Sequence, residues 1–352
     1  MINTIATNIT RARQRRGLTM EELASMVNCS KQAISHYENG LRYPDSKMLL
    51  SIAEALRVDI EFFYSACNVE FSMYNVSYRE GAWLTDRQKS DVEELTSCKL
   101  NDYLELENIA KESVTFQNPL KDILVGSPDD VEKAAKALRK KWGLGEGAIA
   151  NIINFLERKG VRVIKIDFQF GYRHEGLSGW AEENTVPVIV LNAKQSDITR
   201  MRFTLLHELG HLLLIIQDGL DDNMIERLCD AFAGAVLLPA EVLVQEFGRN
   251  RTAISMAELR RIKELYGISV QAIMVRARVT NLIPYAAYEK WKKADCSDCD
   301  YGQYQGAEEP QKFLQMLYRC LSEKKIGYDK AAKLAGISEN ELIKSYAQHI
   351  DF

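Results

Sequence analysis

The sequence predicts an α+β fold that is mostly helical, with an N-terminal all-α domain followed by a second domain that contains a small sheet. At 352 residues the chain exceeds the usual size of one domain, so we expect two or three. Apolar residues recur at helical spacing along most of the chain, whereas only the runs VRVIKID and VPVIVLN have the β-rich composition of strands. The composition, 46% hydrophobic and 27% charged, is typical of a folded globular protein.

Composition also limits the location and the partners of the chain. No stretch approaches the roughly 18 apolar residues that cross a bilayer, and the N-terminus lacks the order of a signal peptide. We therefore expect a cytoplasmic protein without membrane contact. The seven scattered cysteines favour reduced thiols over a disulfide framework. A net charge of −4 excludes a chain that is basic throughout, so any nucleic-acid site must be local.

The first segment, residues 1–66, has the pattern of short helices separated by tight turns. Thr19 and Ser30 are residue types that cap helix N-termini, and residues 46–56 carry an apolar helical face. We predict a domain of five helices here. Residues 67–126 contain one clear helical stretch and are interpreted as a helical connector.

The pattern becomes clearer from Ser127, where Ser-Pro-Asp-Asp is a strong helix start. We assign one domain to residues 127–290, and a linker with a C-terminal helical pair to residues 291–352. The helices expected in these two regions are 127–142, 147–159, a long apolar helix after Ser196, 222–235, 239–247, 255–266, 269–278, 309–323 and 328–347.

The segment TMEELASMVNCSKQAISHYENGLRYPD resembles the Xre-type helix-turn-helix of phage repressors. The residue pattern agrees with this fold, because apolar residues at Leu23, Ala24, Val27, Ile34 and Tyr37 form a buried seam between two crossing helices. The turn after Val27 sets the second helix at an angle that fits a major groove. The resemblance implies that this domain binds a double-stranded DNA operator.

The resemblance also assigns the DNA contacts. A glutamine in the second helix suits adenine, and a lysine beside it suits guanine or a phosphate. Residues 1–66 hold eight Lys or Arg against seven Asp or Glu, so a monomer should bind weakly and a homodimer on a two-fold site is favoured. The alternative is a helix-turn-helix that serves as a protein-interaction module. The predicted DNA contacts are Lys31, Gln32, Ser35 and His36 in the groove, with Thr19 and Arg42 among the phosphate contacts.

The motif H-E-x-x-H occurs once, as His207, Glu208 and His211. On a helix, residues four apart share a face, so both imidazoles reach one ion, while Glu208 can hold a metal-bound water. Hydrolytic zinc sites use three protein ligands and keep one position open, so a third ligand is expected on a following helix. Glu226 is the candidate, and Asp230 on the same face suits the outer N–H of a ligand histidine.

The alternative is an ordinary amphipathic helix with two surface histidines. The flanking sequence, RMRFTLLHELGHLLL, is too apolar for that interpretation. Two histidines and a glutamate buried on such a helix would be costly without a metal or hydrogen-bond partners.

This segment and the following IERLCDAFAGAVLLP together resemble the ImmA/IrrE family of metallopeptidases over about residues 127–280. Cys229 stands where the family usually has a small alanine. The resemblance implies a gluzincin-like zinc metalloendopeptidase fold with a small sheet beside the site. An extended peptide would add to the edge of that sheet, which we expect within residues 178–192.

The resemblance further implies that one Zn²⁺ per chain is held by His207, His211 and Glu226, with Glu208 as general base. A second electrophile is usual, and the sequence does not choose among Tyr172, His174, Tyr285 and Tyr288. Manganese or iron remain open, because a nitrogen and oxygen ligand set admits several divalent ions.

The function implied is regulation through cleavage of a repressor-like or antitoxin-like protein partner. One alternative is a non-proteolytic transcription regulator whose metal site is sensory or structural, but a purely structural site has no use for Glu208. Another alternative is self-cleavage, with the connector as substrate. Cys296 and Cys299 form a C-x-x-C without a second ligand pair, so we interpret them as linker cysteines.

Overall fold

The computed structural model describes residues 2–58, 60–64, 71–73, 86–166, 176–182, 185–294 and 301–348. The fold is α+β and mostly helical, which confirms the fold class predicted from the sequence. The chain divides into two compact units. One unit comprises Met1–Phe71, Thr85–Ser113 and Gln311–Phe352, and the other comprises Ser72–Leu84 and Val114–Pro310.

The first unit begins with four short α-helices and a 3-10 helix around one apolar core, so the fifth expected helix is only a single 3-10 segment. The core is formed by residues such as Ile9, Leu23, Ile34, Ile52 and Phe63, all fully buried. Thr19 and Ser30 cap α2 and α3, as predicted, and Asp45 caps α4. The elements are α1 (Ile2–Arg15), α2 (Met20–Met26), α3 (Lys31–Glu38), α4 (Ser46–Leu56) and η1 (Ile60–Tyr64).

A long helix and three C-terminal helices complete the first unit. The helix expected at 328–347 is divided into two helices. Gly336 ends one helix in the left-handed region, with φ of 69°, and Ser338 starts the next by pairing with Glu341. The elements are α5 (Asp86–Ala110), α14 (Lys312–Ser322), α15 (Tyr328–Ala335) and α16 (Glu339–Gln348).

The second unit contains the H-E-x-x-H motif on one of its longest helices. Its largest core joins that helix, α8, to α9, α6 and the sheet. No single helix among the described residues is long and apolar enough to cross a membrane, although α9 and α10, bent by 53°, pass that test as a pair. The helices are α6 (Pro128–Trp142), α7 (Ile152–Arg158), α8 (Ile198–Leu213), α9 (Asp222–Leu237), α10 (Ala240–Phe247), α11 (Met256–Tyr266), α12 (Val270–Val279) and α13 (Tyr285–Lys293).

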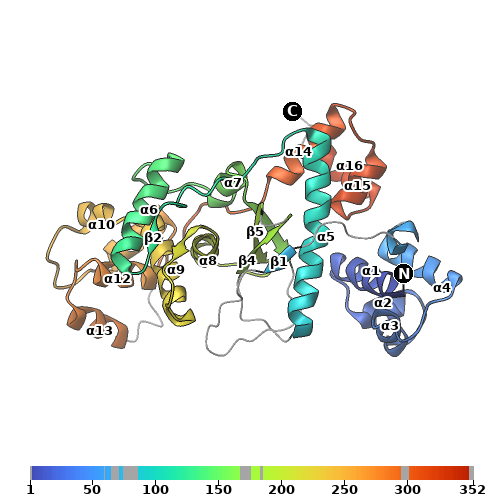
Figure 1. Ribbon diagram of the computed structural model, residues 1–352, viewed down its shortest axis with the longest axis horizontal. Coiled ribbons are helices and arrows are strands. Elements are labelled where there is room, and N and C mark those ends of the chain that lie inside the picture. The colour runs from blue at the N-terminus through green and yellow to red at the C-terminus, as the bar shows by residue number, and fades with distance from the viewer. Residues whose placement is uncertain are drawn as a thin grey trace. The chain divides into compact units, whose positions relative to one another are not determined.

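The main sheet has the strand order β1-β4-β5-β3, and β1, β4 and β5 lie side by side in Figure 1. The two predicted strands are β3 (Arg162–Ile166) and β5 (Val186–Asn192), which pair in parallel. β4 (Gly176–Ala181) runs antiparallel to β5. A separate parallel pair joins β2 (Leu124–Val125) to β6 (Ile215–Ile216).

The expectation that residues 178–192 form a sheet edge is wrong. β5 lies between β4 and β3, and β4 lies between β5 and β1 (Phe71–Met73). The strand that covers β4 comes from a distant part of the chain. Sequence analysis placed residues 71–73 in a helical connector and predicted no strand there.

Residues 301–310 belong to the second unit, and Glu308 in this segment contacts both α7 and α8. Glu308 is buried and accepts hydrogen bonds from the backbone N–H groups of Ile152 and Ile153, at 2.9 and 3.0 Å from Oε2. It also forms an ion pair with Arg202 of α8, and both side chains are fully buried. The second compact unit therefore extends to Pro310.

Candidate metal centre

The helix that carries the candidate site begins at a well-formed cap and is buried along most of its length. Asp197 accepts hydrogen bonds from the backbone N–H groups of Thr199 and Arg200, at 2.9 and 3.2 Å. At Gly210 the helix meets α9 closely, because a Cβ added there would lie 3.2 Å from the Cys229 Sγ. This close approach brings the side chains of α8 and α9 together.

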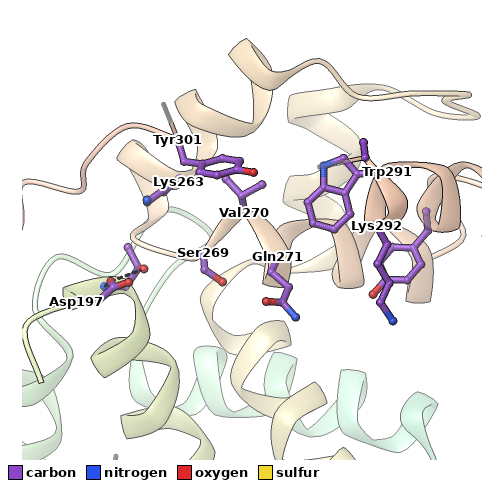
Figure 2. A pocket seen from close by; sticks show the side chains of 11 residues that line it. Asp197, Lys263, Ser269, Val270, Gln271, Trp291, Lys292 and Tyr301 are labelled. Carbon is purple, nitrogen blue, oxygen red and sulfur yellow. Dashed lines mark hydrogen bonds between the residues drawn. The ribbon is translucent and has the colours of Figure 1, made fainter. Parts of the chain in front are cut away.

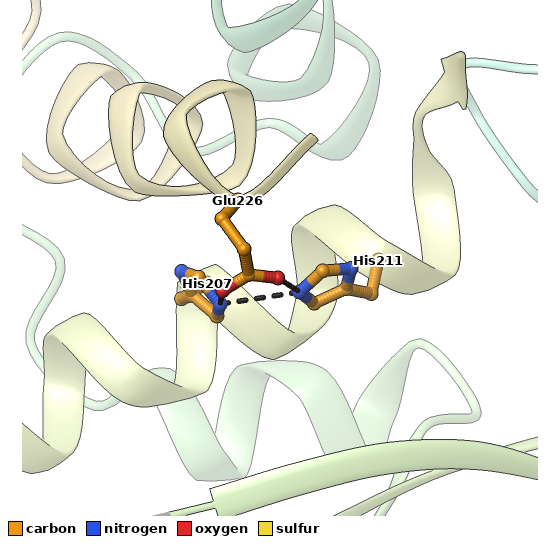
Figure 3. Close-up of side chains that lie close together, drawn as sticks. All are labelled: His207, His211 and Glu226. Carbon is orange, nitrogen blue, oxygen red and sulfur yellow. Dashed lines mark hydrogen bonds and ion pairs between the residues drawn. The ribbon is translucent and has the colours of Figure 1, made fainter. Parts of the chain in front are cut away.

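Three side chains from these two helices converge, as Figure 3 shows. The Nε2 atoms of His207 and His211 lie 3.1 Å apart. Glu226 of α9 places Oε2 3.4 Å from the His207 Nε2 and Oε1 3.1 Å from the His211 Nε2. The structure thus brings together the three residues that sequence analysis selected as metal ligands.

The spacing of these donor atoms fits a small divalent ion. Zinc bonds to nitrogen or oxygen at roughly 2.0–2.2 Å, so two ligands of a tetrahedral site stand roughly 3.3–3.5 Å apart. The three observed separations, 3.1, 3.1 and 3.4 Å, are close to that value. Two imidazoles and a carboxylate are also a donor set that zinc favours.

The outer nitrogens of both histidines face α9 as well. The Nδ1 of His207 lies 2.8 Å from the Asp230 Oδ1, and the Nδ1 of His211 lies 3.6 Å from the Cys229 Sγ. These contacts favour the tautomer in which each Nδ1 carries the proton and each Nε2 faces the centre. Glu226, Cys229 and Asp230 stand at positions i, i+3 and i+4 of one helix, so they share the face toward α8.

The site has an excess of negative charge. Burial lowers the pKa of His207, but the hydrogen bonds to Asp230 and Glu226 outweigh it and raise that pKa to about 10. A cation is therefore strongly favoured at this position. Burial, together with the neighbouring carboxylates, raises the pKa of the Cys229 thiol well above its ordinary value. The thiol stays protonated and neutral.

Glu208 follows His207 in α8 and contacts β4. The Ser178 Oγ donates a hydrogen bond to the Glu208 Oε2 at 2.7 Å, and both residues are buried. This partner was missed by sequence analysis. The only sequence signal is a polar residue in the β4 run GLSGWA, and nothing in that run connects it to Glu208.

The structure does not select one of the four residues that sequence analysis considered as the second electrophile. Tyr172 and His174 lie outside the described residues, as do Cys296 and Cys299. Tyr285 is 63% exposed at the start of α13, and the Arg278 guanidinium lies over the Tyr288 ring, 5.0 Å from its centroid.

A separate pocket of about 460 Å³ lies between the N-terminal ends of α8 and α12 and the helix α13. Figure 2 shows Lys263 and Tyr301 on one side and Trp291 and Lys292 on the other. None of its lining residues belongs to the His-His-Glu cluster, so it is a different feature of the second unit.

The helix-turn-helix places its predicted contact residues on and around α3. Lys31 and Gln32 are exposed in the first turn, whereas Ser35 and His36 are half-buried. Lys31 pairs with Glu21 at 2.5 Å. The other two positions are exposed: Thr19 caps α2, and Arg42 follows α3.

Arg13 of α1 and Glu38 of α3 form an ion pair within the helix-turn-helix domain. The Arg13 Nε and Nη2 donate to the two carboxylate oxygens of Glu38, at 2.6 and 2.7 Å. Both side chains are almost fully buried, so this bidentate pair fixes α1 against α3.

Comparison with known proteins agrees with both halves of this description. Residues 9–63 match the helix-turn-helix family, and residues 156–278 match the family described as IrrE N-terminal-like domain. The chain is therefore similar to the helix-turn-helix family in its first part and to the IrrE N-terminal-like domain family in its second part.

The radiation response metalloprotease IrrE of Deinococcus radiodurans is 28% identical over 163 residues. The match covers 42% of this chain and 48% of that relative, so the chain spans about half of its length. Bacillus thuringiensis PlcR, in complex with the peptide PapR7 and DNA, aligns over 99% of this chain and 98% of its own at 15% identity. The TM-score of this alignment is 0.17.

Proposed function

We propose that this chain is a DNA-binding regulatory metalloendopeptidase that cleaves a repressor-like or antitoxin-like protein. The observation that carries the proposal is the convergence of His207, His211 and Glu226 at tetrahedral spacing, with Glu208 beside them. The name of the IrrE relative, a radiation response metalloprotease, supports a regulatory role of this type. Action on an operator would require that the protein is located in the cytoplasm.

The three clustered residues would hold one Zn²⁺ per chain through the two Nε2 atoms and the Glu226 carboxylate. When bound, such an ion supplies a water of lowered pKa and polarises the scissile carbonyl. Asp230 and Cys229 hold the outer nitrogens of the two imidazoles, and so fix the direction of the inner ones.

Glu208 is the proposed general base. The hydroxyl of Ser178 holds the Glu208 Oε2, which leaves the other carboxylate oxygen to accept a proton from the attacking water. The same carboxyl group then returns the proton to the leaving amine. A base at this position has no purpose in a metal site that is only structural.

The N-terminal domain would read an operator through α3. Gln32 and Lys31 are exposed at the start of that helix, where a major groove would meet them. Ser35 and His36 would contact the groove further along, and Thr19 and Arg42 would contact phosphates. We keep the four-part division at residues 1–66, 67–126, 127–290 and 291–352, and a homodimer on DNA, as proposals.

The test is elemental analysis of the purified protein beside His207→Ala and Glu208→Gln. We expect one zinc per chain in the wild type, loss of metal in the first variant and retention in the second. Wild type and Glu208→Gln are then incubated with a cell extract, and fragments that only the wild type produces identify the substrate.

The outcomes separate the alternatives. Absence of metal in the wild type would sink the peptidase proposal. Bound metal without any cleavage would instead favour a transcription regulator with a sensory site. Fragments of the chain itself, recovered after expression of the wild type alone, would indicate self-cleavage.

A further inference from the structure

The pocket at the N-terminal ends of α8 and α12 has the size of a small-molecule site. Its volume of about 460 Å³ lies within the range, roughly 300–1,000 Å³, of pockets that enclose small ligands. Its lining residues all belong to the second unit, and none of them is one of the three proposed metal ligands. The residues that line the pocket therefore define a ligand chemistry of their own.

The charges around the pocket favour an anion. Two lysines line it, Lys263 from the last turn of α11 and Lys292 from the last turn of α13. The only carboxylate among the described lining residues is that of Asp197, which accepts hydrogen bonds from the backbone N–H groups of Thr199 and Arg200 at 2.9 and 3.2 Å. The lining side chains thus carry two positive charges against one negative charge, which the start of α8 already stabilises.

The start of α12 adds two backbone donors. Ser269 caps this helix by accepting a hydrogen bond from the Ala272 N–H at 3.2 Å. The next two residues, Val270 and Gln271, line the pocket, and their backbone N–H groups have no acceptor within the described part of the chain. Free N–H groups and the positive end of the helix dipole together favour a phosphate at such a position.

Aromatic rings form another part of the pocket wall. Tyr288 and Trp291 of α13 line the pocket with ring centroids 6.1 Å apart, and Tyr301 lines it as well. In Figure 2 the Gln271 side chain lies between those of Tyr301 and Trp291. A flat ring stacks well on aromatic side chains, and the Gln271 amide can donate and accept hydrogen bonds at the edge of that ring.

We propose that this pocket binds a nucleotide, that is, a planar aromatic base linked to a phosphate group. The base stacks on Trp291, and the phosphate binds at the start of α12 and to the ammonium groups of Lys263 and Lys292. This inference goes beyond the proposed function and does not depend on it, because it uses neither the metal nor Glu208.

The first test is isothermal titration of the purified full chain with adenosine monophosphate as the probe. Adenosine and inorganic phosphate are titrated separately. We expect one saturable site per chain for the nucleotide and weaker binding of either fragment, because each fragment satisfies only part of the wall. Absence of saturable nucleotide binding up to about 1 mM would overturn the proposal. So would adenosine or inorganic phosphate that binds as tightly as the nucleotide.

The second test locates the site with matched variants. Lys292 and Lys293 are neighbours on α13 and both are exposed, but only Lys292 lines the pocket. We expect Lys292→Met to weaken nucleotide binding by roughly 2- to 5-fold, as for an exposed ion pair, and Lys293→Met to leave it unchanged. Removal of the stacking ring in Trp291→Leu should weaken binding by roughly 5- to 160-fold.

A further variant controls for the packing role of Trp291, which is half-buried against the core of the second unit. Trp291→Phe keeps a ring, so it should bind the nucleotide more tightly than Trp291→Leu, and the circular dichroism of both variants is compared with that of the wild type. Wild-type affinity in both Lys292→Met and Trp291→Leu would show that the nucleotide binds elsewhere on the chain, and would refute the assignment to this pocket.

Discussion

Replacing Glu308 by alanine should destabilise the second unit more than any nearby surface change. Its carboxylate pairs with the buried Arg202 of α8 and accepts the backbone N–H groups of Ile152 and Ile153 at the start of α7. Burial raises the pKa of Glu308 while Arg202 opposes that rise. The attraction between the two charges therefore offsets only part of the free-energy cost of removing the carboxylate from water. Alanine would leave the arginine charge buried without its counterion.

The size of the effect follows from what each group loses. Removing one partner of a buried ion pair costs about 3–5 kcal/mol, and the helix start adds about 1 kcal/mol because Ile152 and Ile153 lose their acceptor. Arg202 keeps its bonds to the carbonyls of Gly267 and Ile149, at 3.1 and 2.6 Å. We therefore expect a total loss at the lower end, about 4 kcal/mol. At roughly 2–4 °C per kcal/mol, we expect Tm to fall by roughly 8–16 °C.

The assay is scanning calorimetry in the presence of a chelator, so that metal binding does not contribute. Glu309→Ala is the matched control, because the neighbouring carboxylate pairs with Lys165 at 2.7 Å while its own side chain is 58% exposed. Such a pair is worth roughly 0–1 kcal/mol. Equal shifts for the two variants would refute the reasoning that burial makes the Glu308 pair critical.

Three further predictions concern single contacts. Asp230→Ala should weaken metal affinity by roughly 10- to 100-fold, measured against a chromophoric chelator, because the outer nitrogen of His207 loses its acceptor. Ser178→Ala should keep the metal, yet lower kcat by roughly tenfold, because the Glu208 carboxylate loses the hydrogen bond that the Ser178 hydroxyl donates at 2.7 Å. Hydrogen bonds from Arg251 and Ser255 hold the pKa of Glu258 at about 2, below its ordinary value of 4.5. The stability that this carboxylate contributes is therefore complete above pH 4.5 and lost toward pH 2. In urea unfolding, the difference between wild type and Glu258→Gln should shrink across that window.

The sequence predicted those parts of the fold that local pattern determines. Helix caps such as Thr19 and Ser30 mark helix starts in the structure, because capping is a contact within one turn. Four-residue spacing on a helix defines a shared face for His207 and His211, and the structure brings Glu226 of α9 close to both. Their role as ligands stays a proposal.

Long-range contacts could not be predicted in the same way. Neither the pairing of β1 with β4 nor the burial of Glu308 leaves a local signal, since each partner lies about a hundred residues or more away. The serine that contacts Glu208 belongs to β4 and precedes Glu208 by 30 residues in the sequence. Contacts of this kind depend on how the elements pack, and a single sequence carries no direct record of that packing.

The H-E-x-x-H helix supplies only part of the centre, and α9 supplies the rest. One face of α9 offers Glu226 toward the inner nitrogens and Cys229 with Asp230 toward the outer ones. That arrangement requires α9 to lie very close to α8, and the missing side chain of Gly210 permits it, because a Cβ there would press on Cys229. The glycine of HELGH therefore contributes to the site as directly as the histidines. A larger side chain at this position would press on Cys229 and displace the helix that carries Glu226 and Asp230. The close packing of α9 therefore supports the proposal more strongly than the motif does alone.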